Sequence, residues 1–497
     1  MKQDSWINRN VARLMPRSFK VNTASSPANT AQLAPKKVAS EAAAPAAKRT
    51  GARSTRERLH GTLRHADEAL SPRVLRRILQ ELQAVIDDRV SEVEGGRRAA
   101  ALMAWYAGAT PARRLDLWLL MSEMFVADPV KAQAAHAKLA SALGTADEAA
   151  AEVHYRRATV SPRRRLLQRF SADAAGIRFL VNLRAEMQSA VKADKRLQAL
   201  DVEMEYMFST WFDVGFLELR RISWDSPASL VEKLIKYEAV HDIKSWADVK
   251  NRLDSDRRCY GFFHPRLPDE PLIFVEVALV DALTDCITPL LDESADAADL
   301  HAATTAIFYS ISNTQDGLRG VSFGDSLIKR VVETLKAEFP HLKTFATLSP
   351  IPGFRSWLQK NAAAQLDQLD DKAREELGRA CGFEPVTASH FLAAAEAPLS
   401  LRAGSAVQHM LMRCAAQYLG RETHQGKPLD PVARFHLGNG ARVERLNWAG
   451  DPSPKGVKQS YGLMVNYLYD LKRLDKHREG LATGRIPVAS AVSNLFF

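Results

Sequence analysis

The chain has 497 residues, 46% hydrophobic and 25% charged, which is too long for one ordinary core and too apolar for a wholly disordered polymer, so we expect two folded domains. Residues 1–60 hold twelve Lys or Arg against three Asp or Glu and so carry +9 of the formal charge of +10. Because the rest of the chain is nearly neutral, it lacks the broad basic field that nucleic-acid backbones require, and we expect no nucleic-acid partner.

The cysteines and the hydropathy pattern narrow the class of protein further. The four cysteines are far apart and form no C-x-x-C pair: Cys259, Cys286, Cys381 and Cys414. This argues against a zinc ribbon or a thioredoxin-like site and fits a reducing compartment. No run of eighteen apolar residues occurs, so we expect no membrane span.

Residues 1–55 are predicted to be a disordered basic leader. Residues 21–55 consist mainly of Ala, Ser, Thr, Pro, Lys and Arg, which offer few large apolar side chains to bury. A basic, acid-poor N-terminus is also typical of a mitochondrial transit peptide, so an organellar leader and a solvated tail without function are both open. The C-terminal residues 493–497 lack a peroxisomal S-K-L ending, and we favour the cytoplasm.

Residues 56–210 have a helical pattern. Ser71-Pro72 and Ser161-Pro162 are each typical of an N-cap followed by Pro at the first helical position. Gly95-Gly96 is expected to end the first helix. The apolar residues that recur at helical spacing include Val74, Leu75, Ile78, Leu79, Leu82, Val85, Ile86, Leu115, Trp118, Leu119, Met121, Met124, Leu166, Leu167 and Phe170. We predict a helix bundle that serves as a structural or oligomerising domain.

Residues 211–497 change to an α/β pattern. The β-rich runs 272–280, 306–311 and 344–348 are predicted strands, and a helix with one apolar face is predicted between Ser326 and Phe339. A strand, a glycine-bearing turn, a helix and a further strand indicate a mixed α/β domain.

The turn at residues 316–325 lies between a predicted strand and the start of the following helix. Its glycines let the backbone approach a ligand, and free N–H groups at a helix start favour phosphate. The turn resembles the one with which acetyltransferases of the GNAT superfamily hold the pyrophosphate of coenzyme A, matching at Arg319 and Gly324 but carrying Ser322 where a glycine is usual. A purely structural turn is the alternative.

Two residues are candidates for proton or oxyanion chemistry. Ser349 ends the last predicted strand; Pro350 and the Pro352-Gly353 turn leave its backbone little freedom, although its hydroxyl could simply bond its own backbone. His436 lies between Phe435 and Leu437, where an apolar pocket would lower its pKa and keep it available for proton transfer, although most such histidines are ordinary core residues.

These segments together resemble the malonyl-CoA decarboxylase family. The resemblance is carried by residues 306–312, 338–342, 348–354 and 430–437, and it extends from Trp211-Phe212 through residues 257–260 to residues 462–467. It implies a helical N-terminal domain, a catalytic domain of GNAT-like fold, and conversion of malonyl-CoA to acetyl-CoA and carbon dioxide. It also implies a homo-oligomer, a dimer or a tetramer assembled through the helical domain.

The resemblance assigns residues to roles. Ser349 and His436 are the expected catalytic residues, and the expected malonyl-CoA loop is Arg319, Gly320, Val321, Ser322, Phe323, Gly324 and Asp325. Family members can carry an acid where this chain has Ser322. Further candidates are Asn447, Asn466 and Tyr467 for the pocket, and Lys329 and Arg330 for coenzyme A phosphates. The expected reaction requires neither a metal nor an organic cofactor, coenzyme A being part of the substrate.

Two other functions remain compatible with the sequence. An acyltransferase of the same fold would move an acyl group from coenzyme A to an amine, and would make no acetyl-CoA from malonyl-CoA alone. A non-catalytic scaffold would bind malonyl-CoA without converting it.

Overall fold

The computed structural model describes residues 53–497 except residues 67, 322, 324–326 and 497. These residues belong to one compact unit, Thr50–Phe497. Most of the predicted leader therefore lies outside the described residues, and the first described helix begins at Thr55.

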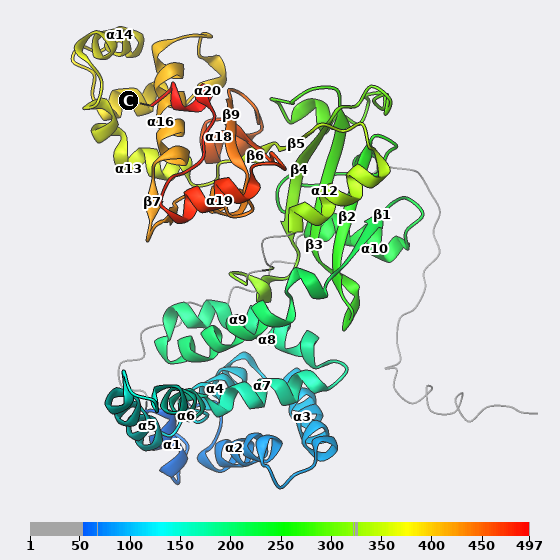
Figure 1. The fold of residues 1–497 in the computed structure, drawn as a ribbon, viewed down its shortest axis with the longest axis vertical. Helices are drawn as coiled ribbons and strands as arrows, with labels where there is room; N and C mark the ends of the chain where they lie inside the picture. Colours follow the sequence, from blue (N-terminus) through cyan, green and yellow to red (C-terminus); the bar gives the residue numbers. More distant parts are fainter. Residues whose placement is uncertain (1–52, 67, 322, 324–326, 497) are drawn as a thin grey trace, which may run out of the picture. The chain divides into compact units, whose positions relative to one another are not determined.

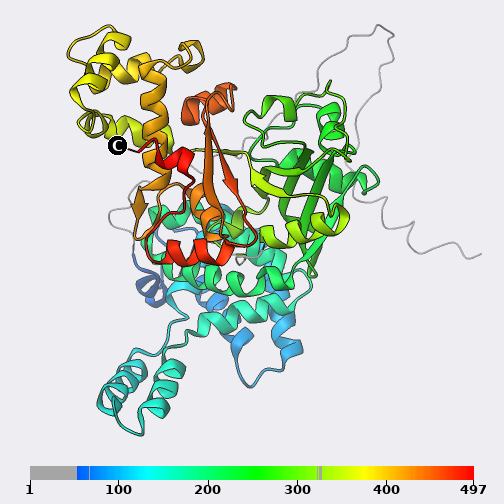
Figure 2. The ribbon, with the colours of Figure 1, turned by 45° about the horizontal axis from the view of Figure 1, so that its top comes forward.

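The first part of this unit is helical, as predicted. Among the described residues, its α-helices are α1 (Thr55–His60), α2 (Pro72–Ile86), α3 (Glu92–Ala107), α4 (Pro111–Glu123), α5 (Pro129–Ala142), α6 (Glu148–Thr159), α7 (Pro162–Ala172), α8 (Gly176–Ala193) and α9 (Gln198–Trp211). Ser71 and Ser161 cap α2 and α7, each accepting a backbone N–H, with Pro at the first helical position. Helices α5 and α6 form a hairpin and pack chiefly against each other (Figure 2).

The expectation that Gly95-Gly96 ends a helix is wrong. Helix α2 ends at Ile86, and both glycines lie inside α3. A Cβ on Gly95 would stand only 3.1 Å from the carbonyl oxygen of Val85. Gly95 therefore serves the close packing of α3 on the end of α2 rather than chain termination.

The second part is a mixed sheet with helices. Its strands follow the order β1-β2-β3-β4-β5-β10-β6, and β9 also pairs with β10. Their bounds are β1 (Glu218–Ile222), β2 (Arg257–His264), β3 (Leu267–Val280), β4 (Thr305–Asn313), β5 (Thr344–Thr347), β6 (Ser349–Pro350), β9 (Arg442–Asn447) and β10 (Met464–Leu468), with a separate hairpin of β7 (Thr423–His424) and β8 (Lys427–Pro428). The predicted fold class, a helical region followed by a mixed α/β region, is confirmed.

The helices of this part are α10 (Ala228–Tyr237), α11 (Trp246–Arg252), α12 (Leu327–Glu338), α13 (Phe354–Leu366), α14 (Asp371–Cys381), α15 (Ala388–Ala394), α16 (Ala406–Gly420), α17 (Pro431–Gly438), α18 (Pro454–Ser460), α19 (Leu474–Ala482) and α20 (Ser490–Ser493). Helix α12 connects the parallel strands β4 and β5 and lies across one face of the sheet (Figure 1). Its predicted apolar face is buried: Leu327, Ile328, Val331, Val332 and Leu335.

The sheet opens where β4 and β5 part. The two strands pair from Thr305 to Phe308 on β4 and from Thr344 to Thr347 on β5, and β4 then continues to Asn313. Strand β10 pairs with β5 near its end, at Leu468, and with β6 at its start, at Met464 and Val465. Ser349 therefore begins a short continuation of β5 beyond Leu348. Ser349 thus lies at the carboxyl end of a parallel strand, just beyond the last β4–β5 pair.

Candidate active site

The two predicted catalytic residues meet in the folded chain. The Oγ atom of Ser349 lies 3.3 Å from Nε2 of His436, although 87 positions separate them in sequence. Both side chains are buried. Their approach brings a hydroxyl and an imidazole within hydrogen-bond distance of each other.

His436 is positioned by a short, well-capped helix. It lies in the last turn of α17, which begins with Pro431 after the N-cap Asp430. One carboxylate oxygen of Asp430 accepts the N–H groups of Val432 and Ala433, each at 2.9 Å. Such caps satisfy backbone donors that the helix itself cannot, and so fix where its first turn starts.

The same cap ties the helix to the turn that follows Ser349. The hydroxyl of Tyr418 donates to Oδ2 of Asp430 at 3.3 Å. A Cβ on Gly353 would lie 2.2 Å from that hydroxyl, so the Pro352-Gly353 turn fits against Tyr418 because it has no side chain there. Through Tyr418, the segments that carry the serine and the histidine are held together.

A chain of hydrogen bonds defines the protonation of the pair. Ser349 donates its hydroxyl proton to Oγ1 of Thr347 at 2.9 Å, and Nδ1 of His436 lies 2.7 Å from the hydroxyl of Tyr469. Because the serine proton points to Thr347, Nε2 of His436 must carry a proton and donate it to Ser349, and Nδ1 must accept from Tyr469. The imidazole thus directs its N–H at the hydroxyl of Ser349.

Burial keeps His436 neutral in the free protein. Desolvation lowers its pKa from 6.5 to about 3. The ring also stacks on that of Tyr467, with centroids 4.7 Å apart and an angle of 25° between the planes. A neutral imidazole in this apolar setting gains a proton only when an anion approaches it.

A pocket of about 690 Å³ connects the histidine with part of the predicted substrate loop. His436 and Phe435 line it from α17, Ile311 and Asn313 from the end of β4, and Val321 and Phe323 from the loop; the other lining residues are Ile273, Pro431, Val432, Arg434, Gly438 and Asn439. The volume and the apolar lining suit a small acyl group on a longer chain.

The remaining loop residues divide into two groups. Arg319 is exposed and forms an ion pair with Asp316 at 3.0 Å, and Gly320 has a left-handed φ of +83°. Neither lines the pocket. Ser322, Gly324 and Asp325 lie outside the described residues.

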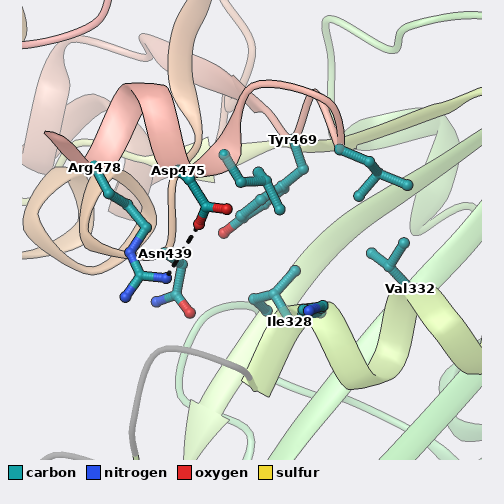
Figure 3. Close-up of a pocket in the computed structure, with 9 residues that line it drawn as sticks. Ile328, Val332, Asn439, Tyr469, Asp475 and Arg478 are labelled. Atoms are coloured by element: carbon teal, nitrogen blue, oxygen red, sulfur yellow. Dashed lines mark ion pairs between the residues drawn. The ribbon is translucent and has the colours of Figure 1, made fainter. Parts of the chain in front are cut away.

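A smaller pocket of about 140 Å³ lies beside the larger one, and Asn439 lines both. Figure 3 shows Ile328 and Val332 of α12 opposite Tyr469, with Asp475 and Arg478 of α19 at the other end. Lys329 also lines this pocket, whereas Arg330 donates to the carbonyls of Val214 and Leu217. Of the two predicted phosphate ligands, Lys329 thus lines the smaller pocket, whereas Arg330 is bound to the backbone between α9 and β1.

The three pocket candidates from the sequence have different surroundings. Tyr467 stacks on His436, and its hydroxyl has no hydrogen-bond partner among the described residues. The side chain of Asn466 donates to the carbonyl of Thr347 at 2.7 Å and accepts from that of Asn447 at 2.8 Å. The asparagines therefore support the strand that carries Thr347, outside the lining of the larger pocket.

Sequence reasoning missed Thr347 and Tyr469. Both directly bond the candidate pair, and the backbone N–H of Tyr467 also donates to Oγ1 of Thr347. The available signal was slight: Thr347 lies two residues before Ser349, and Tyr469 two after Tyr467, as neighbours on one face of an extended chain do.

Within the described ranges, no three His, Cys, Asp or Glu side chains gather as a metal site would require. Of the helices described, none has the length and apolarity needed to cross a membrane.

Known proteins match the chain over most of its length. The family model described as the malonyl-CoA decarboxylase C-terminal domain matches residues 215–496, and the model of the N-terminal domain matches residues 125–212. The mitochondrial malonyl-CoA decarboxylase of Anser anser anser is 37% identical over 397 residues, covering 76% of this chain and 78% of that protein. The enzyme of the same name from Rattus norvegicus is 38% identical over 394 residues, 76% of this chain and 80% of its own.

Solved structures agree with these sequence relatives. The malonyl-CoA decarboxylase from Cupriavidus metallidurans is 44% identical with a TM-score of 0.70, and covers 85% of this chain and 100% of that one. The enzyme from Rhodopseudomonas palustris is 40% identical with a TM-score of 0.72, at 84% and 99% coverage.

Proposed function

The chain belongs to the malonyl-CoA decarboxylase family, and from this premise we propose that Ser349 and His436 convert malonyl-CoA to acetyl-CoA and carbon dioxide. The observation that carries the proposal is the contact of 3.3 Å between the two side chains. His436 also lines the larger pocket, and Ser349 lies behind it, outside the lining. A serine and a histidine from distant segments converge there with the residues that orient them.

The proposed reaction consumes one proton in each turnover. The bond between the α-carbon and the carboxylate breaks, carbon dioxide leaves, and the electron pair stays on the thioester as an enolate. The malonyl carboxylate, by binding near His436, raises the pKa of the imidazole and recruits a proton from solvent. The imidazolium then protonates the α-carbon and returns to its neutral form.

Ser349 is assigned the stabilising role. When the substrate enters, its hydroxyl is placed to donate to the malonyl carboxylate or to the enolate oxygen, where negative charge develops. Tyr469 holds the imidazole through Nδ1, and Thr347 holds the hydroxyl. No step of this proposed reaction requires a metal or an organic cofactor.

The test measures carbon dioxide release from malonyl-CoA by purified protein. We expect His436→Ala and Ser349→Ala each to lower kcat by about 10²- to 10³-fold, since removal of one proton donor or oxyanion partner typically costs that much. His301→Ala, an exposed histidine on the β3–β4 connection, is the control and should retain wild-type kcat. Near-wild-type release by His436→Ala would refute the assignment.

The acyltransferase alternative is tested with the same substrate. Radiolabelled malonyl-CoA without an acceptor should yield acetyl-CoA with the wild-type protein. Recovery of unchanged malonyl-CoA that turns over only when an amine is added would favour the transferase.

The assembly and the location of the protein also belong to this proposal. We propose a homo-oligomer, a dimer or a tetramer, assembled through the helical region. Support comes from the exposed Val130, Leu143 and Val153 on the α5–α6 hairpin, and light scattering would measure the mass in solution.

The cytoplasm is the expected location, although the goose and rat relatives are called mitochondrial. Cell fractionation with N-terminal sequencing tests it.

A further inference from the structure

A buried arginine in the helical region contacts the turn that leads into the pocket wall. Arg184 of α8 is 2% exposed. Its Nη1 atom donates to the carbonyl oxygens of Gly317 at 2.8 Å and Arg319 at 2.9 Å. These two acceptors lie in and just after the short 3₁₀ turn Asp316–Leu318, which precedes Val321 and Phe323.

We propose that Arg184 is a positioning residue for substrate binding: it fixes this turn so that Val321 and Phe323 line the pocket that His436 also lines. The inference deepens the proposed function and rests on it, because it takes the pocket to be the malonyl-CoA site. The helical region then helps to shape the substrate site as well as any oligomer.

The guanidinium of Arg184 is held by two carboxylates of α9 as well as by the carbonyls of the turn. Its Nε atom donates to a carboxylate oxygen of Asp201 on α9 at 2.8 Å, and Nη2 lies 3.5 Å from Glu205. The carboxylates compensate the buried charge. The remaining N–H donors are thereby free to hold neutral backbone carbonyls.

The turn lies directly on the backbone of α8. A Cβ on Gly317 would stand 1.9 Å from the carbonyl oxygen of Val181, so only glycine allows this approach. A second link joins Arg178 of α8 to the side chain of Gln315 at 2.8 Å.

Phe323 is held from the connection between α9 and β1. Its carbonyl oxygen accepts the N–H of Val214 at 3.0 Å, and Arg330 donates to the carbonyl of Val214 at 2.6 Å. The wall of the pocket is therefore anchored at the turn by α8 and at Phe323 by Val214. A loosened turn would have to be reordered each time substrate binds, which weakens binding without altering the reacting groups.

The experiment compares Arg184→Met with Arg163→Met. The first change keeps an apolar stem and leaves Asp201 and Glu205 partly open to water. We expect it to raise KM for malonyl-CoA by about 10- to 100-fold with kcat within about threefold of wild type. Arg163 is equally buried but donates to the carbonyls of Met121, Ser122 and Ala199, all in the helical region, so its variant should lose thermal stability while KM stays unchanged.

A KM within twofold of wild type in Arg184→Met, or an equal rise in Arg163→Met, would overturn the inference. If Arg184→Met does not fold, Gly317→Ala displaces the turn while leaving Arg184 intact, and an unchanged KM in that variant overturns it instead.

Backbone hydrogen exchange separates this inference from the proposed function. In Arg184→Met the amides of residues 316–321 should exchange at least tenfold faster than in Arg163→Met or wild type. If wild-type protein releases no carbon dioxide, the proposed function fails, and this exchange still decides the inference. Equal exchange rates in the two variants would overturn it.

Discussion

At the scale of residues, the candidate site consists of one neutral imidazole held from both sides. Nε2 of His436 is directed at Ser349 and Nδ1 at Tyr469, so both ring nitrogens have a partner and the ring has a single orientation. Buried networks of this kind, when every member is satisfied, rigidify the groups they contain. Removal of one member leaves a buried partner unpaired, so it should lower stability as well as alter catalysis.

Tyr469→Phe tests this orientation. Loss of the hydroxyl leaves Nδ1 unpaired and allows the other tautomer, so we expect kcat to fall by roughly tenfold or more. Tyr309→Phe is the matched control, because that buried hydroxyl has no hydrogen-bond partner among the described residues and its removal should leave kcat unchanged. Steady-state carbon dioxide release measures both. A Tyr469→Phe enzyme as fast as the Tyr309→Phe enzyme would contradict the role given to Tyr469.

The depressed pKa of His436 predicts how stability depends on pH. Its value in the folded protein is about 3, below the value of 6.5 for an exposed histidine. The folded state favours the neutral ring, so this stabilisation is complete above pH 6.5 and is lost as pH falls toward 3, by at most about 1.4 kcal/mol per pH unit. Urea unfolding between pH 7 and 4 should show a steeper loss for wild type than for His436→Gln. Parallel curves would show that the histidine is not buried as described.

At the scale of elements, α17 determines where His436 lies. The helix has only eight residues, and its first turn depends on the cap by Asp430. A helix this short owes its position to its cap and its packing rather than to its own propensity.

Asp430→Ala removes the acceptor for two N–H groups and for the hydroxyl of Tyr418. We expect a loss of about 1–2 kcal/mol in the free energy of unfolding, together with a lower kcat because the turn that carries His436 shifts. Asp430→Asn keeps a good cap and should retain most of both properties. Denaturant titration measures the stability of the two variants, and carbon dioxide release measures their turnover. A wild-type kcat in Asp430→Ala would contradict a role of the cap in positioning His436.

At the scale of the whole molecule, one large apolar cluster joins the helical region to the sheet. A single cluster of buried residues runs from Leu59 in α1 to Val492 in α20. The turn Asp316–Leu318 also packs against α8. The predicted boundary at residue 210 therefore divides the chain by type of secondary structure, while the described residues pack as one unit.

This continuity predicts the behaviour of a fragment. Residues 214–497 expressed alone would expose the apolar surface that α8 and α9 cover, so we expect aggregation or a melting temperature well below that of the intact chain. Solubility and thermal unfolding by circular dichroism measure this. A fragment that is soluble and unfolds cooperatively at the wild-type temperature would show that the sheet needs no helical partner.

The sequence by itself determined the local elements and predicted the candidate pair. The capping signals at Ser71 and Ser161, the apolar face of α12 and the strand runs of β3, β4 and β5 all appear where the pattern predicts them, because each depends on residues a few positions apart. Ser349 and His436 were identified from the segments around them, through a resemblance to one family. The prediction that Gly95-Gly96 ends a helix is wrong because Gly95 packs against the carbonyl oxygen of Val85 in the preceding helix, a contact that no local pattern shows.

The tertiary structure alone decided which residues surround that pair. The contacts of Tyr469 and Thr347 with the histidine and the serine, the link from Gly353 through Tyr418 to Asp430, and the hold of Arg184 on the turn at Gly317 all join residues from separate segments. No local pattern encodes such contacts, since they arise when β10 pairs beside β5 and when α8 packs on the turn. The protonation of His436 follows from the same packing, because only burial in the assembled core removes the water that would otherwise stabilise its charge.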